Sequence, residues 1–402
     1  MQAQTPTTPN SLSPTYSYVA ALLFLVVIGA LLAAAVVGVV RHPQKFAALF
    51  EKPTQEDVLQ GHLTSKAQTL FEEVFVLKDQ AVGLWGAARY ALFHTGSKGV
   101  LIGKNGWLFT TEEFQEYPNA RQERHHKLEI ITQVRDYLRA HQVELVVALV
   151  PAKARIYPHA LGALKLPPDK QRLYDHFRQK LIAKDILVPD IATAFTKERH
   201  HQKLFMRSDT HWSPKGAQLA AQEVAQAVKK HCPSLVLPPI ELDTHTAKRE
   251  KYEGDLQKFV TTANYRRLLK LPNEMLQRTT TTVHSGGGAS DALFAEEKLS
   301  VVLVGTSYSA YAQWNFDGAL KSALEADVLN VADEGGGPMA PMAKYLRDTD
   351  LSTQAPAIVI WEIPERFIDK PYDDVHFDKL APAHKGAKGQ HRACTSVDEG
   401  SH

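Results

Sequence analysis

The fold is decided by one stretch, Lys298-Leu-Ser-Val-Val-Leu-Val-Gly-Thr-Ser-Tyr-Ser309. Val301 to Val304 has the composition of a strand that is buried on both faces, and Gly305-Thr-Ser307 is typical of a tight turn. A serine that follows a buried strand and precedes a helix can present its hydroxyl outward, beside the N–H groups of the helix end. Ser307 is therefore predicted either as a nucleophile or as the N-cap of the next helix, a role that serine often fills.

Further apolar runs of strand length place this stretch in a layered domain. The predicted strands besides 299–304 are Val143–Val150, Ile186–Ile191, Val328–Val331 and Ala357–Trp361. Between them lie segments with helical patterns, at about 121–142, 168–184, 213–231, 314–325 and 338–347. This alternation predicts a parallel sheet covered by helices on both faces, with the functional site at the carboxyl ends of the strands.

A second stretch, Arg207-Ser-Asp-Thr-His-Trp-Ser-Pro-Lys-Gly-Ala217, holds Asp209 and His211 two residues apart. Ser213 and Pro214 are the residue types preferred at the N-cap and at the first position of a helix. A serine nucleophile needs a histidine base and a carboxylate that fixes the tautomer of that histidine. The residues alone are equally compatible with a surface aspartate that caps a turn beside an ordinary histidine.

Both stretches resemble those of a known family. Asp209-Thr-His-Trp212 followed by Gly305-Thr-Ser-Tyr-Ser309 is similar to the alginate O-acetyltransferase group of the SGNH-hydrolase-like proteins, of the AlgJ and AlgX type. The other similar stretches are Gly103-Lys-Asn-Gly-Trp-Leu-Phe109, Val150-Pro-Ala-Lys-Ala-Arg-Ile-Tyr-Pro158 and Trp361-Glu-Ile-Pro-Glu-Arg-Phe367. The resemblance keeps the same order along the chain. It implies an SGNH-hydrolase-like α/β/α sandwich in which the serine block comes last, the reverse of ordinary SGNH esterases.

The resemblance also implies the roles of the three residues. Ser307 is expected to be the nucleophile, His211 the base and Asp209 the orienting carboxylate. An acetyl group would pass from a membrane-bound O-acyltransferase, through acetyl-serine, to a hydroxyl of an exopolysaccharide such as alginate. The residues themselves support only serine acyl transfer, so two alternatives stay open. One is a polysaccharide acetylesterase, and the other is a non-catalytic polysaccharide-binding assembly protein.

Candidates for substrate binding lie after the predicted strands. They are Lys153, Arg155, Tyr157, Tyr308 and Gly336. The first three are predicted either to contact an anionic polymer or to cap a strand end. The run Gly335-Gly-Gly-Pro338 permits close approach of the backbone to an acceptor sugar, or is a simple loop. The backbone N–H of Ser307 is the first candidate for the oxyanion hole, and the second donor is unassigned.

Several classes of function are not supported by the sequence. The net charge of +2 over 402 residues indicates no nucleic-acid partner. No phosphate-binding or dinucleotide motif is visible, so no cofactor is expected. The adjacent pairs His125-His126 and His200-His201 have poor spacing for metal ligands, so no metal is expected. With only Cys232 and Cys394, we expect no disulfide framework.

The N-terminal region predicts a membrane anchor. Residues 1–17 are polar and carry no Lys, Arg, Asp or Glu, which predicts a disordered tail. Residues 18–41 contain the uninterrupted apolar run Val19–Val40, which is long enough to cross a bilayer as a helix. A cleaved signal peptide is the alternative, since Ala33-Ala-Ala35 are small. The missing basic segment before the apolar run favours an uncleaved anchor.

The orientation of this anchor is ambiguous in the sequence. Arg41, Lys45 and Lys52 follow the span and no basic residue precedes it, which by the positive-inside rule places the large domain in the cytoplasm. The family resemblance implies the opposite side. Long domains are translocated largely regardless of charge, so we predict a single-pass protein of the bacterial inner membrane with its catalytic domain in the periplasm.

The remaining boundaries follow from composition. Residues 42–98 are predicted as a helical linker region and residues 99–380 as the catalytic domain, beginning with a hairpin at 100–109. An insertion at about 238–298 interrupts the alternation and contains a Gly/Ser-rich tract. Residues 381–402 are polar and are predicted as a disordered tail.

Overall fold

The computed structural model describes residues 14–51, 54–269, 271, 273–283, 300–371, 375–377 and 380. The predicted tail at 381–402, most of the predicted tail at 1–17 and the Gly/Ser-rich tract lie outside these residues. The chain forms two compact units. One comprises residues 1–89 and 261–268, and the other comprises residues 90–260 and 269–402.

The second unit is built on a sheet of four parallel strands. Its order is β3 (Glu144–Val150), β10 (Ile358–Pro364), β8 (Val301–Val304) and β9 (Val328–Asn330). Trp361 of β10 lies opposite Val147 of β3 and Val304 of β8. All residues of β8 and β10 are buried, because helices cover both faces of the sheet. The predicted parallel α/β/α sandwich is confirmed.

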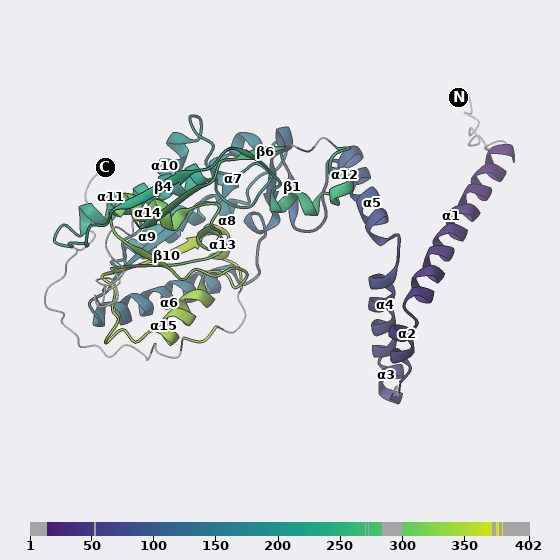
Figure 1. Ribbon diagram of the computed structural model, residues 1–402, viewed down its shortest axis with the longest axis horizontal. Helices are drawn as coiled ribbons and strands as arrows, with labels where there is room; N and C mark the ends of the chain where they lie inside the picture. The colour runs from purple at the N-terminus through teal and green to yellow at the C-terminus, as the bar shows by residue number, and fades with distance from the viewer. Residues whose placement is uncertain are drawn as a thin grey trace, which may run out of the picture. The chain divides into compact units, whose positions relative to one another are not determined.

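Helices form one layer on each face of this sheet (Figure 1). One layer holds α10 (Ile191–Glu198), α11 (Pro214–His231) and α14 (Phe316–Leu324). The other holds α6 (Ala120–Ala140), α9 (Leu173–Ile182) and α15 (Met339–Asp348). Alternate residues of β8 enter the two cores, with Leu303 in the first and Val304 in the second. This is the period of two that a strand imposes on its side chains.

A side-chain cap marks the start of several helices, and two expectations need correction. Ser213 accepts a hydrogen bond from the N–H of Gly216 and caps α11, as predicted. Residues 186–191 do not form a strand, since only Leu187 makes a bridge, to Val146. Pro189 offers no N–H, and Asp190 caps α10 instead. The helix predicted at 168–184 is two helices, α8 (Pro168–Gln171) and α9.

The predicted hairpin is present and has a tight turn. β1 (Val100–Ile102) pairs with β2 (Leu108–Thr110), and a single turn of 3-10 helix at Lys104–Gly106 joins them. Asn105 and Gly106 have φ angles of 53° and 74°, the left-handed region that Asn and Gly tolerate best. Leu108 and Phe109 are fully buried, so the hairpin is part of the domain core.

The insertion has structure of its own. β4 (Leu242–Thr246) pairs with β7 (Thr279–Val283), and β5 (Glu250–Tyr252) pairs with β6 (Glu274–Leu276), both antiparallel. A 3-10 segment, η4 (Asp255–Phe259), follows β5.

At the end of α11, Cys232 is disulfide-bonded, which was not expected from the sequence. Cys394 lies outside the described residues.

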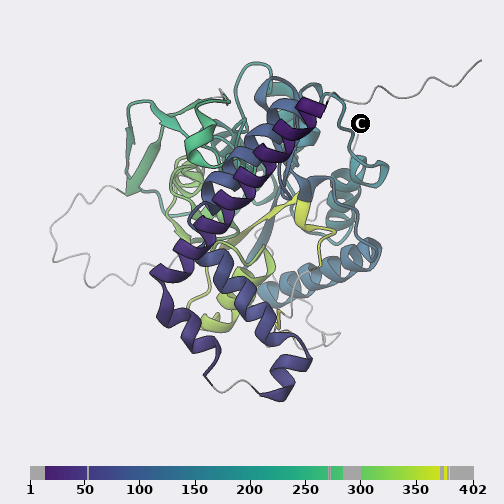
Figure 2. The ribbon, with the colours of Figure 1, turned by 90° about the vertical axis from the view of Figure 1, so that its right-hand side faces the viewer.

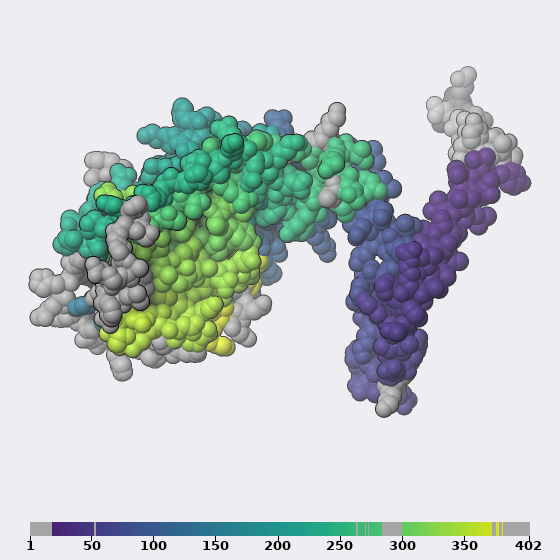
Figure 3. All heavy atoms as spheres, in the orientation of Figure 1, coloured from purple at the N-terminus to yellow at the C-terminus, as the bar shows by residue number. Residues whose placement is uncertain are grey.

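The first unit contains the predicted membrane helix. α1 (Pro14–Arg41) is one continuous helix (Figure 2). Its segment Tyr18–Arg41 contains an 18-residue window with a mean hydropathy of 3.0, and it is long and apolar enough to cross a membrane by length and composition. Helix α1 also contacts α4 (His62–Val74), as Figure 3 shows. Gly38 permits this close approach, because a Cβ at residue 38 would lie 2.6 Å from the carbonyl oxygen of Val74.

The region predicted as a linker contains further helices. They are α2 (Pro43–Leu49), α3 (Gln55–Leu59) and α5 (Lys78–Phe93), with α12 (Ala263–Arg266) added from the insertion. Thr54 and Asp57 form a reciprocal capping box at the start of α3. The residues between α1 and β1 thus form several helices rather than one.

Candidate active site

Three side chains from two distant segments form one line of hydrogen bonds. Asp209 Oδ1 lies 2.7 Å from His211 Nδ1, and His211 Nε2 lies 2.8 Å from Ser307 Oγ. The carboxylate assigns the ring proton to Nδ1, which leaves Nε2 to accept the hydroxyl proton of Ser307. Asp209 and His211 are 1% and 5% exposed, so water does not compete for these bonds. Such an arrangement can activate a serine as a nucleophile.

The start of α13 (Ser307–Ala310) resolves the two readings of Ser307. The N-cap is Thr306, whose side chain accepts a hydrogen bond from the N–H of Tyr308. The hydroxyl of Ser307, the first residue of the helix, is therefore not used as the cap and faces His211. The N–H of Ser307 is among the first of the helix, which have no partner inside it, and it remains our candidate for one oxyanion donor.

A buried carboxyl group holds this turn from below. Glu362 of β10 accepts hydrogen bonds from the N–H of Thr306 at 2.7 Å and from the hydroxyl of Ser309 at 3.1 Å. A Cβ on Gly305 would lie 2.6 Å from Glu362 Oε2, so only glycine fits at the end of the strand. Burial raises the pKa of Glu362, and the hydrogen bonds from Thr306 oppose that rise.

Both oxygens of Asp209 are fully used. Oδ1 also accepts from the N–H of His211 at 2.9 Å, and Oδ2 accepts from the hydroxyl of Tyr252 at 2.7 Å and from the N–H of Asp255 at 2.8 Å. Burial raises the pKa of Asp209, but the hydrogen bonds from His211 and Tyr252 outweigh burial, so the pKa lies well below its ordinary value. Asp209 therefore stays ionised and orients the imidazole.

Tyr252 and Asp255 were not predicted as site residues. They come from β5 and η4 of the insertion, the segment that interrupts the alternation of helices and strands in the sequence. The only signal was the polar and aromatic segment Tyr252-Glu-Gly-Asp-Leu256 inside an otherwise unpatterned region. Neither composition nor spacing connects that segment to Asp209.

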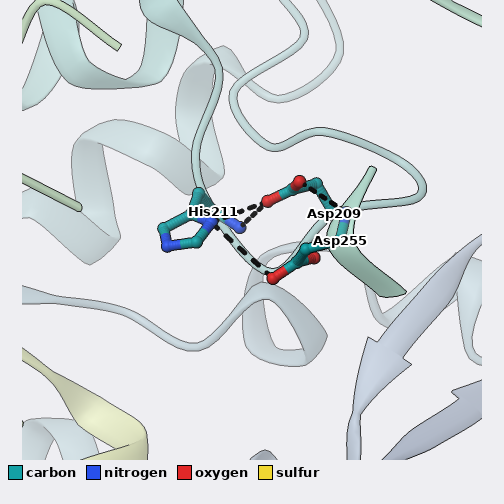
Figure 4. Close-up of side chains that lie close together, drawn as sticks. All are labelled: Asp209, His211 and Asp255. Atoms are coloured by element: carbon teal, nitrogen blue, oxygen red, sulfur yellow. Dashed lines mark hydrogen bonds and ion pairs between the residues drawn. The ribbon is translucent and has the colours of Figure 1, made fainter. Parts of the chain in front are cut away.

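Asp255 places a second carboxylate beside the histidine. Its Oδ2 lies 4.0 Å from His211 Nδ1, and its Oδ1 accepts from the N–H of Thr210 at 2.7 Å. Figure 4 shows the other ring nitrogen of His211 facing away from both carboxylates. Asp209, His211 and Asp255 offer ligand atoms within 4.8 Å of one another, a grouping that could hold a metal ion. The bonds above already use both oxygens of Asp209 and His211 Nδ1, so we assign the group to orientation of the histidine.

Aromatic side chains and an arginine connect the loop that carries His211 to the turn that carries Ser307. The hydroxyl of Tyr308 donates to the carbonyl of Thr210 at 2.8 Å and accepts from Arg366 at 2.9 Å. The indole of Trp212 donates to the carbonyl of Tyr308 at 3.1 Å. Tyr308 is 2% exposed, so its side chain is a structural link and does not reach a substrate. This corrects its expected role in substrate binding.

Three other residues that were predicted to bind substrate make contacts within the protein instead. Lys153 is 1% exposed and donates to the carbonyls of Leu108, Arg207 and Asp209. Arg155 pairs with Glu365 and donates to the carbonyls of Lys170 and Gln171. Tyr157 is 3% exposed and accepts from the N–H of Leu204. These three side chains support the site from the protein interior. Among the five residues predicted to bind substrate, Gly336 is the one that lies in an exposed loop and lines a cavity.

Lys153 predicts a specific dependence of stability on pH. Burial lowers its pKa from 10.5 to about 8, and nearby carboxylates such as Glu113 offset this only in part. The folded protein then binds fewer protons than the unfolded chain between these values, so stability rises with pH across the window. Relative to Lys153→Met, the free energy of unfolding of the wild type is expected to increase by about 3 kcal/mol from about pH 8 to about pH 10.5.

Denaturation of the full chain in detergent, at several pH values, measures this difference. Lys153→Met also removes a donor from three buried carbonyls, a loss that does not depend on pH. A constant difference between the two proteins across the window would mean that Lys153 does not titrate there.

Comparisons with known proteins agree with this geometry. Residues 100–365 match the family model described as SGNH hydrolase-like domain, acetyltransferase AlgX. A protein of Pseudomonas putida named probable alginate O-acetylase AlgJ is 38% identical over 330 residues, covering 82% of this chain and 86% of that protein. Its namesake in Pseudomonas aeruginosa is 36% identical over 337 residues, covering 82% and 85%. The solved O-acetyltransferase domain of Pseudomonas putida AlgJ matches with a TM-score of 0.62 and 38% identity, covering 68% of this chain and 94% of that domain.

Proposed function

This chain belongs to the AlgJ/AlgX family of SGNH-hydrolase-like acetyltransferases, and from that premise we propose that it O-acetylates an exopolysaccharide, alginate or a similar polymer. The observation that carries the proposal is the unbroken line Asp209–His211–Ser307, with the serine at a helix start after a buried strand. A polysaccharide-binding scaffold has no need of an ionised aspartate, an oriented histidine and a free serine hydroxyl in register.

The first half of the reaction loads the serine. Ser307 Oγ forms a bond to the acetyl carbonyl carbon while its proton moves to His211 Nε2. The bond from that carbon to the donor breaks, and the leaving group takes the proton from His211. Asp209 stabilises the imidazolium that exists between these two events. The N–H of Ser307 is placed to stabilise the oxyanion.

The second half transfers the acetyl group. A sugar hydroxyl gives its proton to His211 Nε2, and its oxygen forms a bond to the acetyl carbon. The bond to Ser307 Oγ then breaks, and Oγ recovers the proton from His211. Water in place of the sugar would give acetate, which is the esterase alternative. The chemistry of the three residues is the same in both cases, so the acceptor decides between them.

We place the reaction in the periplasm. The apolar segment Tyr18–Arg41 supports a membrane anchor, followed by a helical region at 42–98 and a catalytic domain at 99–380. An anchored domain would lie close to a membrane-bound O-acyltransferase, which is the partner we propose as the source of acetyl groups. A bacterial inner-membrane location with α1 uncleaved is part of the same proposal.

One experiment separates the alternatives. The full chain in detergent is given a small aryl acetyl ester, and acetate release and intact protein mass are followed with and without oligosaccharides. We expect an acetylated protein that is discharged faster by an oligosaccharide, which itself becomes acetylated. Acetate release that no sugar accelerates would indicate an esterase. A folded protein that binds polymer but forms no adduct would indicate the scaffold.

A further inference from the structure

One helix of the first unit is apolar on every side and is nevertheless exposed. In α5, the run Ala81–Ala88 holds only apolar residues and glycine. A helix that is apolar all round is normally buried in a protein core or in a membrane. Val82, Leu84 and Trp85 are 55%, 60% and 62% exposed, so the described part of the chain leaves them largely uncovered. A contiguous apolar surface of this kind marks a site for a membrane or a partner.

The opposite side of α5 packs within the unit. Gly83 and Gly86 are the buried residues of this helix. A Cβ on Gly83 would lie 2.4 Å from Cδ2 of Tyr265 in α12, and the hydroxyl of Thr261 donates to the carbonyl of Gly83 at 2.7 Å. Trp85 follows Gly83 by about 200° around the helix, so it faces away from α12. The contact with α12 therefore uses the glycine side and leaves the side with the large residues free.

The start of α5 lies beside the end of the apolar span of α1. The two helices α1 and α4 meet where Gly38 faces the carbonyl of Val74, which is buried. Gly38 precedes Arg41, the basic residue at the end of the span, by about one turn. Phe75 ends α4 in an extended conformation, and α5 begins at Lys78, four residues after Val74. An α1 that crosses a bilayer would therefore bring the start of α5 to the bilayer surface.

The length and charge of α5 fit the surface of a bilayer rather than a second span. The helix has 16 residues, whereas a span needs about 20 consecutive apolar residues. Lys78 and Arg89 bracket its apolar run, and the chain has no Asp or Glu from residue 80 to residue 111. Basic residues complement anionic headgroups, and tryptophan favours the boundary between headgroups and acyl chains. Both features favour lipid as the occupant of the exposed side.

We propose that α5 lies on the surface of the bilayer that α1 crosses, with Val82, Leu84 and Trp85 inserted among the lipids. The inference rests on the membrane anchor of the proposed function, since that anchor brings α5 to the surface. The glycine side of the helix packs on α12 and the other side meets lipid, which explains why both sides are apolar. The first unit is then attached to the membrane at two places, by a span and by a surface helix.

Trp85 is a natural probe for this contact, because it is the one tryptophan in the sequence of the first unit. The full chain is reconstituted into vesicles of phosphatidylcholine and phosphatidylglycerol. The emission of the wild type minus that of Trp85→Phe isolates the signal of Trp85. We expect lipids brominated near the headgroup to quench about half or more of this signal, because a surface helix enters the bilayer by about 5–10 Å. Lipids brominated near the ends of the acyl chains should quench it less.

Val58→Trp in the Trp85→Phe chain is the matched control. Val58 is 58% exposed, close to the value for Trp85, and belongs to α3, which contacts α4. The 13 residues of α4 separate α3 from the contact between Val74 and Gly38 by about 20 Å (Figure 1). Tryptophan emission from position 58 should therefore be unchanged by either brominated lipid.

Extraction with alkaline carbonate distinguishes a failure of the anchor from a failure of the surface helix. Release of the full chain from the vesicles would show that α1 is not an anchor, and it would overturn the proposed membrane location together with this inference. A chain that stays with the vesicles while neither lipid quenches Trp85 would overturn the surface helix alone and would favour a protein partner on that side. Stronger quenching by the deeper bromines would also overturn it, because α5 would then enter the hydrocarbon core.

Discussion

Ser307→Ala is expected to lower the rate of acetyl transfer by about 10⁴-fold or more and to abolish the acetylated form of the protein. The alanine removes the only atom that forms the covalent bond, while His211, Asp209 and the turn around residue 307 stay in place. Binding of the acceptor should persist, because the hydroxyl contributes to the bond-forming step rather than to binding. Intact mass after exposure to the acetyl ester, together with the rate of acetate release, measures the loss.

The matched control is Ser309→Ala, which changes the same residue type two positions later. Ser309 is buried and donates to Glu362 at 3.1 Å, so its removal loosens the turn without touching the reacting atoms. We expect a decrease of about tenfold or less for this variant. An acetyl adduct that survives in Ser307→Ala would show that another residue is the nucleophile. Thermal unfolding of both variants checks that the fold is kept.

Asp209→Asn is expected to lower kcat by about 10³- to 10⁴-fold with little change in KM. The carboxylate accepts four hydrogen bonds, from two backbone N–H groups, the His211 ring and the Tyr252 hydroxyl. An amide has only one oxygen, so its NH2 group must face a donor. If it faces the ring, the histidine takes the tautomer with the proton on Nε2, which cannot accept the proton of Ser307.

Asp255→Asn tests whether this effect is specific. Asp255 carries a carboxylate 4.0 Å from the same ring nitrogen, but it bonds to the N–H of Thr210 rather than to the ring. Its pKa is raised by burial and by the charge of Asp209, so neutralising it changes the local charge less than neutralising Asp209 does. We expect a decrease of about tenfold or less. Equal losses in the two variants, or inhibition of the wild type by a chelator, would point to a metal held by the cluster.

Much of the hydrogen-bonded line Asp209–His211–Ser307 was predictable from the sequence. The strand Val301–Val304 and the helix start at Ser213-Pro214 depend on local patterns, namely burial on two faces and capping chemistry. Those patterns place Asp209, His211 and Ser307 in loops at the edges of regular elements. The family resemblance then gave each residue a role, and the distances of 2.7 and 2.8 Å are those that the roles require.

The supporting residues were not predictable in the same way. Lys153, Arg155 and Tyr157 have the side chains of a binding surface, and in the structure they are directed inward, onto carbonyls, a carboxylate and a backbone N–H. The sequence does not show whether a lysine that follows a strand faces solvent or a group of buried carbonyl oxygens. Only the packing of the hairpin at 100–110 against the histidine loop buries Lys153.

The sequence by itself determined most strands and helices of the parallel sheet domain, the apolar N-terminal segment and the short motifs that contain Asp209, His211 and Ser307. These depend on periodicity, length and short motifs, which are properties of neighbouring residues. The tertiary structure alone decided that Glu362 lies under the serine turn, that Tyr252 and Asp255 complete the shell of Asp209, and that Lys127, Phe367 and Lys370 share one cavity. Such contacts join residues far apart in the chain. Their geometry is set by the strand order and by the requirement that each buried polar group find a partner, and neither is written in any local pattern.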